Sequence, residues 1–205
     1  MKIVCIGSSS VEGIGDSKGY GWTGRLNEYL QENSSTNEYR VFNLGLKGDF
    51  LKGTINRYNS EAILRRPHLV IVFTGSNDCI THFNGSDIVK SPNKDDYTKQ
   101  WDDFLLELKK ADHKTLILGP TMVNEKAGPL HYNGLDMTFK NDDLAEYNNV
   151  LKGLCKTHDI NFLEQFNLFA DNIEDLSFDF VHPNDKGYDM LFNNLLQYLK
   201  ENDYV

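Results

Sequence analysis

The sequence has 205 residues, 40% of them hydrophobic and 25% charged, a composition typical of a globular protein rather than a disordered one. Its 21 basic and 30 acidic residues give a formal net charge of −9, which argues against a nucleic acid or an anionic membrane surface as partner. The length suits one domain, and we expect residues 1–205 to fold as a single unit.

Short apolar runs alternate along the chain with amphipathic stretches. Residues 3–6, 39–44, 69–73, 115–118 and 160–163 are apolar almost throughout, which predicts strands buried on both faces of a sheet. Three later stretches carry apolar residues at helical spacing and predict helices that bury one face. Their apolar stripes are Trp101, Phe104, Leu105 and Leu108, then Leu144, Tyr147, Leu151, Leu154 and Cys155, and last Tyr188, Leu191, Phe192, Leu195, Leu196 and Leu199.

This alternation predicts an α/β fold, a three-layer α/β/α sandwich around a parallel sheet of about five strands. The one long segment without a regular pattern is 119–138, which contains Pro120, Gly128, Pro129 and Gly134. Loops of that length in compact domains are mostly functional or disordered. Ligands of open α/β sheets bind beyond the carboxyl ends of the strands, so the segments after the predicted strands are the candidates for a site.

Nothing near the N-terminus predicts targeting. The apolar run of residues 3–6 is shorter than a signal-peptide core, and no later run approaches the roughly 18 apolar residues of a membrane span. Cys5, Cys79 and Cys155 are widely spaced and form no CxxC pair, which argues against a disulfide framework or a zinc site. They predict buried thiols in a reducing compartment. We therefore expect a cytoplasmic protein that requires no metal or other cofactor.

Polar segments that contain glycine follow three of the predicted strands, and a fourth polar segment precedes the last helix. They are Gly7-Ser8-Ser9-Ser10-Val11-Glu12-Gly13, Asn43-Leu44-Gly45-Leu46-Lys47-Gly48-Asp49, Thr74-Gly75-Ser76-Asn77-Asp78 and Asp179-Phe180-Val181-His182-Pro183. Each alone is typical of turns. Together they supply a serine, a histidine and an aspartate, the nucleophile, general base and orienting acid that acyl transfer needs.

His182 is the candidate base for a serine hydroxyl, and Asp179, three residues earlier, is the candidate acid that orients its imidazole. The sequence also permits a structural role for the same pair. In that alternative Asp179 and His182 form the entry cap of the last helix, with Pro183 at its first position. Asp179 and His182 could also serve acyl transfer and cap the helix at the same time.

Acyl transfer further needs hydrogen-bond donors for the developing oxyanion. Ser9 and Gly48 each offer a backbone N–H, and Asn77 offers a side-chain amide. These donors follow three different strands, and a parallel sheet brings the carboxyl ends of its strands to one edge. They complete a candidate site of Ser9, Asp179, His182, Gly48 and Asn77.

The four segments resemble the sequence blocks of the SGNH, or GDSL-type, hydrolase family, and they occur in the family's order from Gly7 to His182. Gly7-Ser8-Ser9-Ser10 with Gly13 is similar to the family's Gly-Asp-Ser-Leu block, which implies Ser9 as nucleophile. Two residues depart from it, since Ser8 replaces the aspartate and Ser10 the leucine. The neutral Ser8 removes a charged group beside the nucleophile.

The other three blocks are matched more closely. Leu46-Lys47-Gly48-Asp49 is similar to the glycine block and implies Gly48 as an oxyanion donor, and Gly75-Ser76-Asn77-Asp78 implies Asn77 as a second donor. Asp179 through His182 matches the Asp-x-x-His block. The resemblance implies a flavodoxin-like fold and metal-free ester hydrolysis through an acyl-enzyme.

We therefore expect a serine esterase that acts on a small-molecule ester, above all on small O-acyl esters of the acetyl type. One alternative is a thioesterase or lysophospholipase for longer acyl chains. An apolar wall for such chains could come from Met122, Leu130, Tyr132, Leu135, Met137 and Phe139, which could equally pack on the core. A second alternative is a non-catalytic flavodoxin-like module whose first loop binds phosphate or flavin. That alternative leaves Asn77 and the Asp179–His182 pair without a role.

Overall fold

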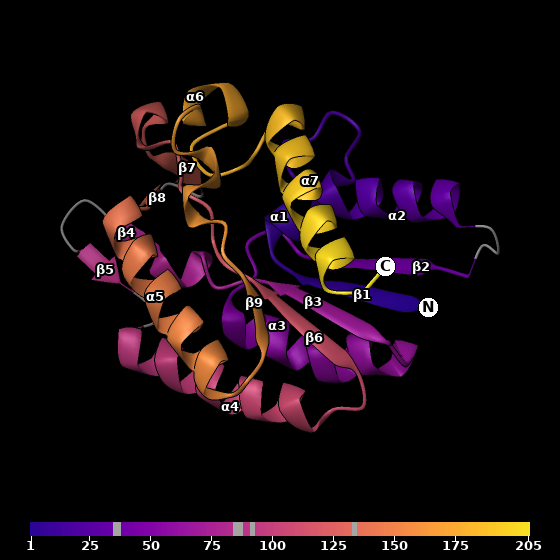
Figure 1. Ribbon diagram of the computed structural model, residues 1–205. Coiled ribbons are helices and arrows are strands. Elements are labelled where there is room, and N and C mark those ends of the chain that lie inside the picture. The colour runs from indigo at the N-terminus through magenta and orange to yellow at the C-terminus, as the bar shows by residue number, and fades with distance from the viewer. Residues whose placement is uncertain (35–37, 84–87, 91–92, 133–134) are drawn as a thin grey trace.

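The computed structural model describes residues 1–34, 38–83, 88–90, 93–132 and 135–205 (Figure 1). Its main sheet has five parallel strands in the order β2-β1-β3-β6-β9. They are β1 (Lys2–Gly7), β2 (Arg40–Gly45), β3 (Leu69–Phe73), β6 (Lys114–Leu118) and β9 (Asn161–Leu163). Each overlaps a predicted apolar run, with bounds that differ by no more than about one residue. The order reverses between β1 and β3 as in flavodoxin-like sheets, which confirms the predicted fold class.

Helices cover both faces of the main sheet (Figure 1). Helices α2 (Gly21–Asn33) and α7 (Asp185–Glu201) cover one face, and α3 (Leu51–Arg57), α4 (Lys94–Lys110) and α5 (Asn141–Thr157) cover the other. Along β1, Ile3 and Cys5 pack in the core beneath α2 and α7, while Val4 and Ile6 pack in the core beneath α3, α4 and α5. All four are fully buried, as the near-continuous apolar run predicts.

The predicted apolar stripes lie on α4, α5 and α7, and the thiols of the three cysteines are buried, as expected. Short helical turns connect the longer elements. They are α1 (Ser9–Glu12), η1 (Tyr58–Ala62), η2 (Ile63–Arg65), η3 (Asn77–Cys79), η4 (Glu125–Ala127), η5 (Phe166–Phe169) and α6 (Ile173–Leu176).

A second sheet, antiparallel and four-stranded, was not predicted. Its order is β5-β4-β8-β7, and its strands are β4 (Thr81–Phe83), β5 (Ile88–Lys90), β7 (Leu130–Tyr132) and β8 (Leu135–Thr138). The prediction that 119–138 is irregular throughout is therefore wrong, because this segment contains η4, β7 and β8. Strands of three or four residues are too short to show an alternating pattern. The dipeptide Asn133-Gly134 is a common hairpin signal in sequences and could have indicated these strands.

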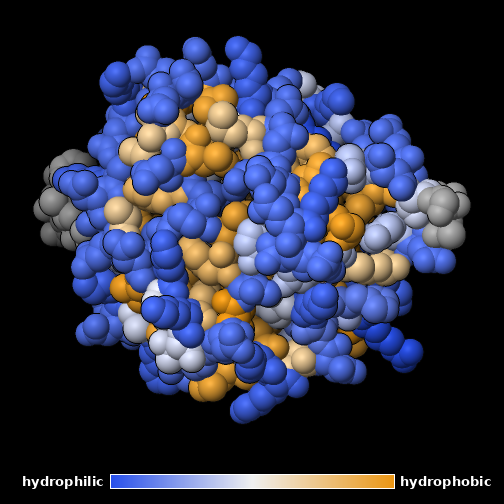
Figure 2. Space-filling model, in the orientation of Figure 1, coloured by the Kyte–Doolittle hydropathy of each residue, from blue (hydrophilic) through white to orange (hydrophobic). Residues whose placement is uncertain are grey.

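The small sheet lies beyond the carboxyl ends of β1 and β3, across the view from the N-terminus (Figure 1). Polar residues cover most of the face in Figure 2, and apolar residues show between them in several places, one of which is the region between α5 and α7 where the edge strand β9 runs. Among the residues that the structure describes, no helix has the length and apolar character to cross a membrane. The same residues include no group of three His, Cys, Asp or Glu side chains placed to hold a metal ion.

Candidate active site

The serine-rich segment forms the turn from β1 into α1. Gly7 ends β1, and a side chain there would place its Cβ 1.9 Å from the carbonyl oxygen of Phe73 on β3, so only glycine permits this close approach. Ser8 is the N-cap residue of α1, and Ser9 is its first residue, with 8% of its surface exposed. The backbone N–H of Ser9 has no partner within its own helix, because the first N–H groups of a helix have no preceding turn.

Hydrogen bonds join Ser9, His182 and Asp179, although 173 residues separate the first two. His182 Nε2 lies 3.0 Å from Ser9 Oγ, and His182 Nδ1 lies 2.8 Å from Asp179 Oδ2. Within the described part of the chain, neither Ser8 nor Ser10 has a comparable side-chain hydrogen bond. The structure therefore distinguishes Ser9 among the three adjacent hydroxyl groups.

Three donors surround the carboxylate of Asp179. Its Oδ2 faces the imidazole, and its Oδ1 accepts hydrogen bonds from the backbone N–H groups of Val181 at 2.8 Å and His182 at 2.7 Å. Burial raises the pKa of Asp179, but the hydrogen bond to His182, the charge of His182 and the two backbone N–H groups outweigh burial, and the net pKa lies below its ordinary value. Asp179 is therefore ionised at neutral pH and can hold the orientation of the imidazole ring.

The structure contradicts the alternative in which Asp179 and His182 cap the last helix. The N-cap residue of α7 is Asn184, and the helix begins at Asp185. The segment before it is closed by a hydrogen bond of 2.8 Å from the Phe178 N–H to the carbonyl of His182. The side chain of His182 faces Ser9 from this closed loop instead of serving the helix end.

The loop after β2 leaves the N–H of Gly48 available. The N–H of Leu46 donates to the carbonyl of Gly7 at 3.0 Å, and the N–H of Lys47 donates to the carboxylate of Glu12 at 2.5 Å. No described residue accepts a hydrogen bond from the N–H of Gly48. Gly48 has a φ of +77°, which favours glycine, and a Cβ there would meet no atom within 4 Å. Its backbone conformation, rather than crowding, explains the glycine.

Asn77 begins η3 after β3, and its amide reaches the same loop. Asn77 Nδ2 donates to the carbonyl of Asp49 at 2.8 Å, which uses one of its two N–H groups. Arg57 anchors this loop, because its guanidinium contacts the Asp49 carboxylate at 2.6 Å. The same guanidinium donates to the carbonyls of Leu44 at 2.7 Å and Gly7 at 2.8 Å. Arg57 thus joins the ends of β1 and β2 to the loop. No sequence motif pointed to this residue.

Asp78 also supports the site, although the sequence analysis assigned it no role. It is 2% exposed, and its Oδ2 accepts the N–H of Leu51 at the start of α3 at 2.9 Å. Burial raises the pKa of Asp78 to about 7, against the lowering effect of hydrogen bonds from backbone N–H groups, and the charge of Asp49 adds to the rise. The carboxyl therefore changes its charge near neutral pH at a position next to Asn77.

We expect Asp78→Asn to change how stability depends on pH. In the unfolded chain this carboxyl is ionised at both pH 5 and pH 8, whereas in the folded protein it is protonated at pH 5 and ionised at pH 8. The wild type therefore loses stability from this group as the pH rises, and the variant does not. The difference in free energy of unfolding, variant minus wild type, should therefore be about 1–3 kcal/mol larger at pH 8 than at pH 5. Urea unfolding measures this difference, and a difference independent of pH would contradict the expectation.

Two cavities meet at the hydrogen-bonded serine. The larger has a volume of about 330 Å³ and is lined by Ser9, Lys47, Gly48, Asn77, Met137, Phe139, Val181 and His182. The smaller, about 30 Å³, also reaches the serine and the histidine, and its other walls include Phe73, Thr121, Val123, Phe139 and Val181. The structure thus brings all the predicted site residues except Asp179 to the wall of one cavity, and Asp179 lies behind His182.

The second sheet contributes one wall of the larger cavity. Met137 lies on β8, and Phe139 follows that strand directly. Phe139 also packs in the core, so the same side chain lines the cavity and contributes to the core. The side chains of Leu130, Tyr132 and Leu135 lie outside the described residues.

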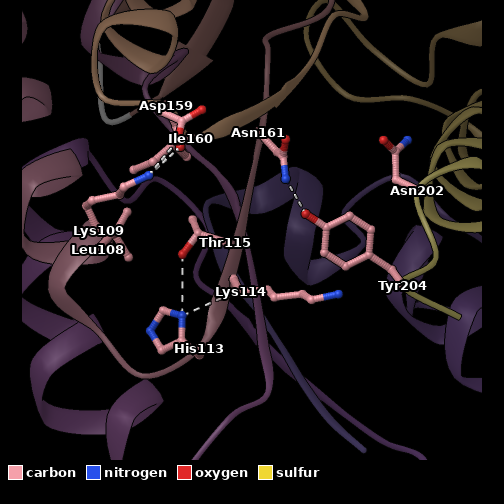
Figure 3. A pocket seen from close by; sticks show the side chains of 10 residues that line it. All are labelled: Leu108, Lys109, His113, Lys114, Thr115, Asp159, Ile160, Asn161, Asn202 and Tyr204. Carbon is pink, nitrogen blue, oxygen red and sulfur yellow. Dashed lines mark hydrogen bonds and ion pairs between the residues drawn. The ribbon is translucent and has the colours of Figure 1, made fainter.

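Another cavity, of about 410 Å³, lies at the end of the main sheet that is opposite to Ser9 (Figure 3). It is larger, but many of its polar groups bind one another: Lys109 Nζ donates to Asp159 Oδ2 at 2.9 Å, and the amide of Asn161 donates to the hydroxyl of Tyr204 at 2.5 Å. Lys114 and Asn161 begin β6 and β9, so this cavity lies at the amino ends of the strands. Ligand sites of open α/β sheets lie at the carboxyl ends, where Ser9 is found.

Known proteins resemble this chain over nearly its whole length. The chain matches the model of the GDSL-like Lipase/Acylhydrolase family over residues 5–190. The crystal structure of the acetyl xylan esterase AlAXEase aligns with a TM-score of 0.77 at 18% identity, over 97% of this chain and 100% of that one. Axe2, an acetylxylan esterase from Geobacillus stearothermophilus, aligns with a TM-score of 0.73 at 19% identity, over 96% and 92% of the two chains. A lipase/acylhydrolase from Enterococcus faecalis aligns with a TM-score of 0.74 at 16% identity, over 98% and 96%.

Proposed function

This chain belongs to the GDSL-like lipase/acylhydrolase family, and from that membership we propose that it is a serine esterase that works through an acyl-enzyme. Ser9 is the nucleophile, His182 the general base and Asp179 the acid that orients the imidazole. The observation that carries this proposal is the hydrogen-bonded series from Ser9 Oγ through His182 to Asp179, with distances of 3.0 Å and 2.8 Å. A phosphate- or flavin-binding module would leave this series without a role.

In the proposed mechanism, Ser9 Oγ forms a bond to the ester carbonyl carbon while its proton passes to His182 Nε2. The carbonyl oxygen becomes an oxyanion, which the N–H groups of Ser9 and Gly48 and the second N–H of Asn77 stabilise. The imidazolium then protonates the alcohol oxygen as the bond between that oxygen and the carbonyl carbon breaks. Water attacks the acyl-enzyme in the same way, with His182 again as base, and releases the carboxylic acid.

We propose small O-acyl esters of the acetyl type as substrates. The recess of about 30 Å³ beside Ser9 has room for a group about the size of one water molecule or methyl, so a long acyl chain would require Phe139 or Val181 to move. The cavity of about 330 Å³ has room for the alcohol portion. Two of the similar solved structures are described as acetyl xylan esterases, in keeping with a short acyl group.

A series of p-nitrophenyl esters from acetate to octanoate tests this proposal. We expect the highest kcat/KM for acetate and a decrease of at least about tenfold by octanoate, because overfilling a packed recess is unfavourable. Val181→Ala enlarges the recess and should move the preferred acyl length upward. A wild-type maximum at long chains would favour the thioesterase or lysophospholipase alternative instead.

We also propose that residues 1–205 act as one catalytic domain, because Ser9 follows the first strand and His182 precedes the last helix. A reducing, cytoplasmic location is in keeping with the buried thiols of Cys5, Cys79 and Cys155.

A further inference from the structure

Among the described residues that line the cavity of about 330 Å³, Lys47 is the one with a Lys, Arg, Asp or Glu side chain. It directly precedes Gly48, and its side chain is exposed. The apolar side chains of Met137, Phe139 and Val181 belong to the same lining. The cavity therefore combines a positive charge, an apolar wall and the reactive serine.

The backbone at Lys47 is held in place. Its N–H donates to the carboxylate of Glu12 at 2.5 Å, and the preceding N–H, of Leu46, donates to the carbonyl of Gly7 at 3.0 Å. Glu12 lies on α1, the helix that Ser9 begins, so the base of the Lys47 side chain is fixed relative to the nucleophile. A lysine whose backbone is held in this way loses less freedom on binding a substrate than one on a mobile loop, which favours discrimination between substrates.

The ammonium group of Lys47 has no carboxylate within ion-pair distance in the described part of the chain. The carboxylates around the site have other partners: Asp49 binds Arg57, Asp179 binds His182, and Glu12 accepts the peptide N–H of Lys47. In a protein with a net charge of −9, Lys47 is thus a local positive charge at the site.

We propose that Lys47 selects esters whose alcohol portion carries an anionic group, a substrate class that rests on the esterase function proposed above. The small recess beside Ser9 is not lined by Lys47, so the charge acts on the side of the alcohol rather than the acyl group. With its ester at Ser9 and an apolar body against Met137 and Phe139, such an alcohol presents its anion to Lys47. Acyl esters of hydroxy acids with an apolar body have this chemistry.

The test compares 4-acetoxybenzoate with its neutral analogue 4-acetoxybenzamide. The quantity measured is kcat/KM for 4-acetoxybenzoate divided by kcat/KM for 4-acetoxybenzamide. The two leaving groups differ in intrinsic reactivity, but this difference is the same for every variant and cancels when the ratios of two variants are compared. We expect Lys47→Met to lower this ratio roughly fivefold, which corresponds to an ion pair of about 1 kcal/mol, and Lys47→Glu to lower it further. Lys47→Arg should keep the ratio. Raising the salt concentration from 0.05 to 0.5 M should reduce the wild-type ratio, because salt screens the attraction.

Lys52→Met is the matched control, because Lys52 is an exposed lysine on α3 that does not line the cavity. It should leave the ratio unchanged. Equal ratios for wild type and Lys47→Met would overturn the inference while esterase activity on both compounds still supports the proposed function. A wild-type protein that cleaves neither ester would overturn the proposed function and the inference together.

Discussion

Replacing Ser9 with alanine should lower kcat for p-nitrophenyl acetate by at least about 10⁴-fold. The reason is that the Oγ hydrogen-bonded to His182 Nε2 at 3.0 Å is the atom that forms the acyl-enzyme in our proposal. Without it, hydrolysis depends on the oxyanion donors and on substrate binding alone, which provide only a small part of the acceleration. Release of p-nitrophenol in steady state and in a pre-steady-state burst measures the loss.

The adjacent serines are natural controls for this experiment. Ser8→Ala and Ser10→Ala each remove one hydroxyl from the same turn, and we expect their kcat to stay within about tenfold of the wild type. A fluorophosphonate should label Ser9 in the wild type, and peptide mass spectrometry locates the adduct. Full activity in the Ser9→Ala variant, or an adduct on Ser8 or Ser10, would refute the assignment of the nucleophile.

Asp179→Asn should lower kcat by about 10³- to 10⁴-fold with little change in the fold. An asparagine amide can donate to His182 Nδ1, and the ring then carries its proton on Nε2, where it cannot accept the proton of Ser9. The geometry would survive while the base function is lost. Circular dichroism and kcat on the same sample separate these two effects.

Asp171→Asn serves as the control for this change, since Asp171 is an exposed aspartate that precedes α6. The low pKa of Asp179 gives a further test. Because the carboxylate is still ionised where an ordinary aspartate becomes protonated, its protonation should not limit activity at mildly acidic pH. Asp179→Asn with nearly wild-type kcat would mean that the aspartate does not orient the base.

Much of the fold could be predicted because its signals are local. The strands of the main sheet coincide with short runs that are mostly apolar, although Asn43 interrupts the run in β2. Helices α4, α5 and α7 carry apolar stripes at helical spacing, so local patterns of apolar residues indicate both kinds of element. The small second sheet could not be found in the same way. Strands such as Thr81–Phe83 and Leu130–Tyr132 are too short for periodicity to show, and the pairing of β4 with β8 joins segments about 50 residues apart in the sequence.

The candidate site, like the fold, could be predicted in part from the sequence. The sequence by itself determined which residues are candidates for the site: Ser9, Gly48 and Asn77 follow strands, and Asp179 and His182 precede the last helix, all in short segments whose residue types suit acyl transfer. The three segments that follow strands meet because parallel strands bring their carboxyl ends to one edge of the sheet, and the loop before α7 brings His182 to Ser9 at the same edge. For this reason the five residues could be named before any distance was known.

Only the tertiary structure decided which of three adjacent serine hydroxyls meets His182, and that Asn184 rather than the Asp179–His182 pair caps α7. It also revealed Arg57 as the residue that holds the glycine loop, and it showed a recess of about 30 Å³ on one side of Ser9 and Lys47 beside the larger cavity on the other. Each of these features depends on distances between groups far apart in the sequence. Residue type and spacing describe what a side chain can do, whereas packing determines which partner it reaches and how much room a substrate has.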